Sequence, residues 1–205
     1  MAKTTWEIAA ENCQKITRNS LNQDWLLPED QLPPAEQLNV ADFVETCGFL
    51  TTRERDITNT SAVDLVQQMA AGSLTAVDTV TAFLKRAHVV HQLTNFATEF
   101  LVDAALETAA ELDAHFKATR KIKGPLHGIP ISVKEHISIK GLICHSSYVV
   151  WADNIAEDDA LIVKCAKAAG GVIHVRTNIP QTLLVSFTSL MQVVHSNADT
   201  NVPEF

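Results

Sequence analysis

Apolar residues recur at helical spacing in several parts of the chain, and most of these stretches begin at residues suited to cap a helix. Thr4 and Glu7 have the spacing of a capping box, and the apolar positions that follow predict an opening amphipathic helix. The same reasoning predicts helices over residues 60–72, 75–91 and 103–116. Their apolar residues are interpreted as core stripes rather than as a cofactor site.

A second pattern, of alternating or short continuous apolar runs, predicts strands. Residues 95–100 alternate between apolar and polar positions, and short apolar runs at 129–133 and 172–175 are bracketed by Gly or Pro. A helix beginning at Asp158–Asp159 is predicted between the last two runs. Strand, helix and strand with short connections form a βαβ unit, which implies parallel strands and a right-handed crossover.

The first 58 residues are predicted to form a helical extension that wraps around a core beginning afterwards. Residues 25–34 hold three prolines among polar positions, which indicates an extended arm. A short helix is predicted from Ala41 to Gly48, where glycine suits the left-handed end of a helix.

Composition narrows the class of protein. The chain has 205 residues, of which 46% are hydrophobic and 20% charged, so one domain can bury a core. Its formal charge of −8 argues against a nucleic-acid partner, because phosphate binding needs a basic stripe and residues 121–123 are the only basic cluster. The apolar runs are too short for a signal peptide or a membrane span, so we expect a cytoplasmic protein without membrane contact.

The cysteines and histidines do not suggest a metal site. The four cysteines stand far apart, at Cys13, Cys47, Cys144 and Cys165. This spacing suits reduced thiols better than a disulfide scaffold or a zinc site. The eight histidines have no acidic or cysteine partner at ligand spacing. We therefore expect no metal and no cofactor, and we interpret His127 and His136 as polar residues at the mouth of a pocket.

Lys134 is the candidate catalytic residue, because it stands where the predicted strand 129–133 ends. Ligands of open α/β sheets bind beyond the carboxyl ends of the strands, so a lysine there is placed like a catalytic group. Its position in the sequence alone favours a solvent-exposed lysine that has no catalytic role. Ser146 and Ser147, in the long loop 135–157, lack the flanking glycines of a nucleophile turn and are interpreted as a loop pair.

A resemblance to a known family favours the catalytic interpretation of Lys134. The segment from Gly124 to His136 reads Gly-Pro-Leu-His-Gly-Ile-Pro-Ile-Ser-Val-Lys-Glu-His and resembles the lysine-bearing segment of the amidase signature family. The likeness continues through Gly141 and through residues 159–162, 169–172 and 177–181. The Lys-Glu-His form, together with residues 47–51 and 56–58, resembles the acetamidase-type general amidases best known from fungi. Many relatives carry Asp at position 135 and often Ala at 171, and both differences are mild.

The resemblance implies a fold and a reaction. The fold would be an N-terminal helical extension followed by part of an α/β/α domain with a mixed or parallel sheet. The reaction would be hydrolysis of linear carboxamides to a carboxylate and ammonia or an amine by a Ser, cis-Ser, Lys triad. Lys134 would act as a neutral amine that takes a proton, through the cis-serine, from the nucleophilic serine. The substrate would be a small amide, and its binding residues are not identified.

From Thr182 onward the resemblance fades, and no glycine follows Gly171. The family's Gly-Gly-Ser-Ser-Gly-Gly segment needs glycines to turn tightly and to aim amide hydrogens at an oxyanion. Lys134 is therefore the only triad member that the sequence retains. We interpret residues 59–183 as the N-terminal part of an amidase domain and 184–205 as a divergent tail. We expect the chain to be inactive alone, with Lys134 as an ammonium group in water.

Two functions remain open. The chain is either an amidase that is cut short or a non-catalytic protein that pairs with a full-length relative or another partner. We prefer the first because the tail shows no recognisable design. Parallel strands are normally covered on both faces by further elements, so we expect an exposed sheet edge and self-association through it.

Overall fold

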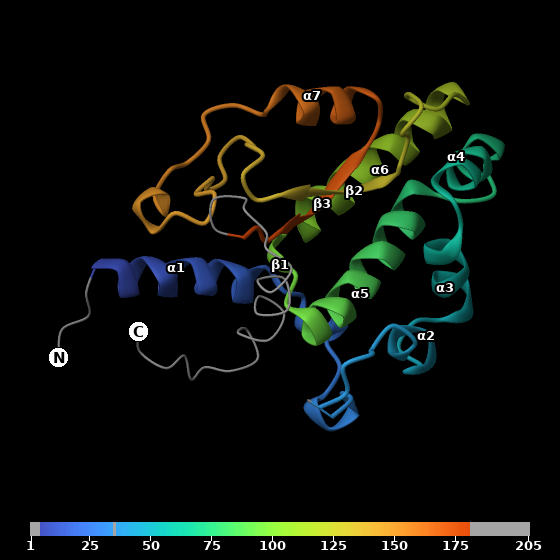
Figure 1. The fold of residues 1–205 in the computed structure, drawn as a ribbon. Coiled ribbons are helices and arrows are strands. Elements are labelled where there is room, and N and C mark those ends of the chain that lie inside the picture. Colours follow the sequence, from blue (N-terminus) through green and yellow to red (C-terminus); the bar gives the residue numbers. More distant parts are fainter. Residues whose placement is uncertain (1–4, 35, 181–205) are drawn as a thin grey trace.

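The computed structural model describes residues 5–34 and 36–180 of the chain (Figure 1). The helical elements, in chain order, are α1 (Thr5–Ser20), the 3-10 turns η1 (Gln23–Trp25) and η2 (Glu29–Gln31), α2 (Phe43–Thr46), α3 (Thr52–Asn59), α4 (Ala62–Ala71), α5 (Ala76–Thr94), α6 (Val102–Thr119), the 3-10 turn η3 (Val149–Trp151) and α7 (Leu161–Ala168). The strands are β1 (Ala97–Phe100), β2 (Pro130–Lys134) and β3 (Val172–Thr177).

The three strands form one mixed sheet in the order β1-β3-β2. Strand β2 runs parallel to β3, with α7 in the connection between them, which confirms the parallel βαβ unit. Strand β1 runs antiparallel to β3. The α/β class and the mixed sheet agree with the expected fold.

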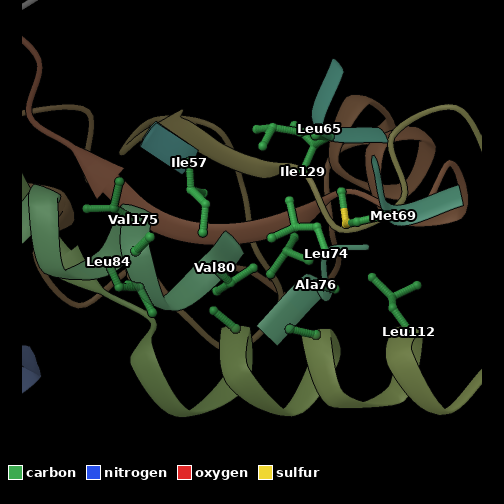
Figure 2. Packing of buried hydrophobic residues seen from close by; sticks show 14 of the residues in the cluster. Ile57, Leu65, Met69, Leu74, Ala76, Val80, Leu84, Leu112, Ile129 and Val175 are labelled. Carbon is green, nitrogen blue, oxygen red and sulfur yellow. The ribbon is translucent and has the colours of Figure 1, made fainter. Parts of the chain in front are cut away.

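Helices cover both faces of this sheet. On one face α4, α5 and α6 pack against Val172 and Val175, and Figure 2 shows Leu74, Val80 and Val175 pointing into this main core. On the other face α7 contributes Val163, which packs with Ile173 of β3. Because side chains alternate across a strand, β3 supplies both cores and is buried along most of its length.

The capping signals placed α4 and α5 correctly. Ser61 caps α4 by accepting a hydrogen bond from the amide of Asp64, and Gly72 ends it in the left-handed conformation, with φ of 76°. Thr75 caps α5 in the same way through the amide of Asp78. The capping role predicted for Thr4 lies outside the described residues.

Helices α6 and α7 do not begin at the residues that the sequence predicts. Helix α6 begins at Val102, so Asp103 is in its first turn rather than at its cap. Helix α7 begins at Leu161 rather than at Asp158–Asp159. Those two carboxylates bind Lys164 and Lys167 instead, and Asp159 also accepts the amide of Lys140 at 2.9 Å. Side-chain pairing on the surface therefore competes with a capping role.

The expected extended arm at residues 25–34 is wrong in detail, because η2 and the end of η1 lie within it. Its anchor is Gln92 of α5, whose side chain accepts from the amide of Leu27 at 2.8 Å and donates to the carbonyl of Leu27 at 2.9 Å. Helix α3 was not predicted, although Thr51 and Glu54 form a complete capping box at its start. The domain boundary at residue 58 stays a prediction.

The C-terminal end of helix α1 lies next to β1, as Figure 1 shows. The Thr17 hydroxyl donates to the carbonyl of Thr98 at 2.6 Å, and the amide of Phe100 donates to the Ser20 hydroxyl at 3.0 Å. These contacts attach the N-terminal helix to an edge strand. Over the described ranges, no helix combines the length and apolar character needed to cross a membrane.

Candidate functional site

Lys134 is the last residue of β2, and its partner in the parallel ladder is Thr177 near the end of β3. Its side chain is exposed. The structure therefore places the predicted catalytic residue at the carboxyl ends of two parallel strands, where the crevice of an open α/β sheet lies. The catalytic role itself stays a prediction.

The next residue, Glu135, has the opposite surroundings, with only 1% of its surface exposed. Its carboxylate accepts hydrogen bonds from the backbone amides of His145 at 2.7 Å and Ser146 at 2.9 Å. The Arg176 guanidinium lies 3.5 Å from the same carboxylate. A buried carboxylate needs such partners, because an unpaired charge is costly away from water.

Arg176 of β3 holds three segments together from a position that is 2% exposed. Its Nη2 donates to the carbonyls of Glu135 and Ile143, both at 2.6 Å. Its Nη1 donates to the Glu99 carboxylate of β1 at 3.1 Å. Within the described residues its Nε has no hydrogen-bond partner. Sequence reasoning missed this residue, since an arginine at a strand end carries no sign of its distant partners.

The serine pair turns the loop that begins at Glu135. Ser146 and Ser147 have φ values of 53° and 62°, the left-handed region that non-glycine residues seldom occupy. The Ser147 amide donates to Nδ1 of His145 at 2.9 Å, and its hydroxyl donates to the carbonyl of Ile179 at 2.8 Å. These contacts are structural and fit the interpretation as a loop pair.

The histidines expected at a pocket mouth lie elsewhere. His127 is 1% exposed, its Nδ1 accepts the amide of Lys123 at 3.1 Å and its backbone lies close against Gly170, so the prediction is wrong for it. Burial lowers the pKa of His127, so its imidazole is neutral at pH 7. His136 has a buried Nδ1 without a partner among the described residues, and it does not line the cavity described next.

A cavity of about 1010 Å³ lies between α1, the sheet and the loop after β2. Its polar wall includes Glu99, Glu135 and Arg176, and Lys134 is not among its lining residues. Cys13 also lines it, and burial, followed by the charges of Glu135 and Asp153, raises the pKa of this thiol. The protonated thiol is a poor nucleophile. Among the described residues, no three His, Cys, Asp or Glu side chains are grouped as metal ligands.

Comparison with known families and sequences gives a consistent result. Residues 78–199 match the family model described as Amidase. The chain is 40% identical over 184 residues to an acetamidase of Emericella nidulans, covering 90% of this chain and 33% of that protein. It is 38% identical over 188 residues to an acetamidase of Aspergillus oryzae, covering 92% of this chain and 34% of that protein. The chain thus spans about a third of the length of these relatives.

Solved structures agree with the sequence matches. A fatty acid amide hydrolase superposes with a TM-score of 0.83 at 36% identity, covering 87% of this chain and 32% of that one. A peptide amidase in complex with the competitive inhibitor chymostatin gives a TM-score of 0.56 at 28% identity, covering 62% of this chain and 26% of that one.

Proposed function

This chain belongs to the amidase family, and we propose that it carries the lysine-bearing part of an enzyme that hydrolyses linear carboxamides to a carboxylate and ammonia or an amine. Lys134 is the member of the Ser, cis-Ser, Lys triad that the chain retains. The observation that supports this role is its exposed position at the carboxyl end of β2, in the segment that resembles the family's lysine segment.

The proposed reaction assigns Lys134 the role of proton acceptor. As a neutral amine it takes a proton, through the cis-serine, from the nucleophilic serine, and that serine attacks the amide carbonyl. The C–N bond then breaks, the amine leaves with a proton, and water hydrolyses the acyl-enzyme to the carboxylate. Such general base catalysis requires the lysine within hydrogen-bond reach of the cis-serine.

We further propose that the chain of 205 residues does not hydrolyse amides alone. Its sequence has no glycine after Gly171, and the family's serine segment depends on glycines to form an oxyanion site. The direct test incubates the purified chain with acetamide, benzamide, an anilide and a fatty acid amide. We expect no rate above that of buffer and no labelling by a fluorophosphonate serine probe. Stoichiometric labelling of Ser146 or Ser147 would overturn this expectation.

The positive test is a chimera. Residues 1–180 of this chain are joined to the part of the Emericella nidulans acetamidase that follows the matched third, and hydrolysis of acetamide is measured. We expect an active chimera whose kcat falls by at least about 100-fold in Lys134→Ala, as for loss of a general base. A matched control, Lys140→Ala, changes an exposed lysine a few residues away and should leave kcat unchanged. A folded chimera without activity would contradict the proposed function.

The second candidate function is a non-catalytic interaction protein. Exposed apolar residues favour it, since they suit a partner surface. They lie in η3, in the loop that follows it and at the start of α7: Val149, Val150, Trp151, Ile155, Leu161 and Ile162. An incomplete amidase domain should self-associate and bind a hydrophobic dye strongly. A sharp monomer peak in light scattering together with cooperative unfolding would favour the interaction protein instead.

A further inference from the structure

The backbone around Lys134 is fixed from both sides. The ladder between β2 and β3 ends at the pair of Lys134 and Thr177. One residue later the amide of Glu135 donates to the carbonyl of Thr177 at 2.9 Å, and the amide of Ile137 donates back to the carbonyl of Lys134 at 2.9 Å. The strand therefore continues directly into a turn instead of fraying after its last paired residue.

The Glu135 side chain joins this turn to a second one. Its carboxylate binds the consecutive amides of His145 and Ser146, ten and eleven positions along the chain. Both are charge-assisted hydrogen bonds, which are roughly twice as strong as neutral ones. The start of the long loop is thus folded back onto the residue that follows Lys134.

Arg176 of β3 binds both ends of this loop start. Its Nη2 binds the carbonyl of Glu135 at one end of the loop start and that of Ile143 at the other. Glu99 and Glu135 flank the guanidinium, so it is held between two carboxylates. A buried ion network adds little stability over apolar residues of the same volume. Its value here lies in specifying one geometry next to Lys134.

We propose that Glu135 and Arg176 are positioning residues for Lys134. Glu135 sets the direction in which the chain leaves β2, Arg176 fixes Glu135 to β3, and together they hold the lysine at the strand end. This inference rests on the proposed function of Lys134 as proton acceptor. A catalytic group must be held within roughly 0.5 Å of its productive place, which an unsupported strand end does not provide.

The first experiment uses the full chain and measures hydrogen exchange by mass spectrometry. We compare the unmodified protein with Glu135→Gln, which keeps the side-chain size and removes the charge, and Glu135→Asp, which keeps the charge. In Glu135→Gln the amides of Glu135, Ile137, His145 and Ser146 should exchange at least about tenfold faster, as expected for a lost bond to a charged group. Glu135→Asp should restore part of the protection.

Controls separate local from global effects. Peptides from the buried part of α5 should keep their exchange rates in Glu135→Gln. Glu54→Gln, which breaks the Lys85 ion pair between α3 and α5, should leave exchange at the four amides unchanged. The inference is overturned if Glu135→Asp exchanges as fast as Glu135→Gln, if only the His145 and Ser146 amides respond, or if all peptides respond equally.

Two further measurements keep the inference testable if Glu135→Gln does not fold. The unmodified protein should already protect the His145 and Ser146 amides, and exchange at the rate of an unstructured peptide would overturn the inference. Arg176→Lys keeps the charge but loses the forked donor, so it should accelerate exchange at the Glu135 and Ile137 amides. Unchanged exchange at those amides in a folded Arg176→Lys protein would also overturn it.

The chimera links the positioning role to turnover. There Glu135→Gln should lower kcat about tenfold or more with KM nearly unchanged, because the interaction acts on the lysine and not on substrate binding. An active chimera whose kcat does not respond to Glu135→Gln contradicts the positioning role alone. A folded but inactive chimera contradicts the proposed function, whereas the exchange rates report on the backbone at Lys134 in either case.

Discussion

The two outer strands of the sheet differ in what covers them. Strand β1 lies against α1, which reaches it through the hydroxyls of Thr17 and Ser20. Strand β2 pairs with β3 on one side, and within the described residues no strand pairs with its other side. Of its five residues only Val133 is buried. The N-terminal helix thus binds one edge, while the part of the chain that the structure describes provides no such cover for the edge that bears Lys134.

This difference fits the lengths of the relatives, which extend well beyond the third that the chain matches. The part of the fold that precedes the sheet completes the β1 edge by itself. Lys134 lies on the edge for which the described residues supply no further strand. Covering that edge would also supply the low-dielectric surroundings that a neutral lysine requires.

The largest expected effect comes from Arg176, which links β3 to both edges. Arg176→Ala leaves the Glu135 carboxylate buried without its cation and should cost about 3–5 kcal/mol of unfolding free energy. Arg53→Ala is the control, because it removes an ion pair with Asp78 whose side chains are 66% and 44% exposed and should cost under about 1 kcal/mol. Urea unfolding measures both, and similar losses would contradict the structural role.

Acid should weaken the sheet through a buried histidine. Burial lowers the pKa of His174 in β3 to about 4. Between pH 6.5 and about 4 the imidazole of His174 is protonated in the unfolded chain but stays neutral in the folded protein. The free energy of unfolding therefore falls as the pH falls. From pH 7 to 5 the unmodified protein should lose about 2 kcal/mol more than His174→Gln.

The control for this pH dependence is His115→Gln, at an exposed position on α6. Its urea midpoint should follow the same pH curve as that of the unmodified protein. A His174→Gln protein with an unaltered slope between pH 7 and 5 would show that His174 does not remain neutral in the folded state.

A smaller loss of stability is expected from weakening the contact between α1 and β1. Thr17→Val removes the hydroxyl that binds the carbonyl of Thr98 and should cost about 1 kcal/mol. Thr108→Val makes the same replacement on α6, at a solvent-exposed hydrogen bond to the helix's own backbone, and should cost less. Thermal unfolding compares the two, and equal effects would mean that Thr17 does not anchor α1 to β1.

The smallest effect is expected at the open edge. Lys134→Ala removes an exposed side chain for which no ion pair is found among the described residues, so stability should change by under about 1 kcal/mol. A larger loss in urea unfolding would indicate that the lysine is held by contacts inside the fold. In the chimera the same substitution should instead abolish turnover, which separates catalytic from structural importance.

Local signals placed most elements correctly, and the exceptions have physical reasons. Helices α4 and α5 combine a capping residue with a broad apolar stripe. Helix α3 has a complete capping box but is mostly polar, with Ile57 as its one buried residue, so periodicity alone does not reveal it. The 25–34 arm is anchored by Gln92, 65 positions away from Leu27, and no local pattern encodes that contact.

The sequence by itself determined the order of helices and strands from α4 onward and the place of Lys134 at a strand end. Caps, spacing and Gly or Pro punctuation act over a few residues, so they can be read along the chain. Only the tertiary structure decided that Glu135 is buried while Lys134 is exposed, and that β1 joins the sheet antiparallel. Arg176 meets Glu135 and Glu99 across 41 and 77 positions, and such pairings form only when distant strands come together.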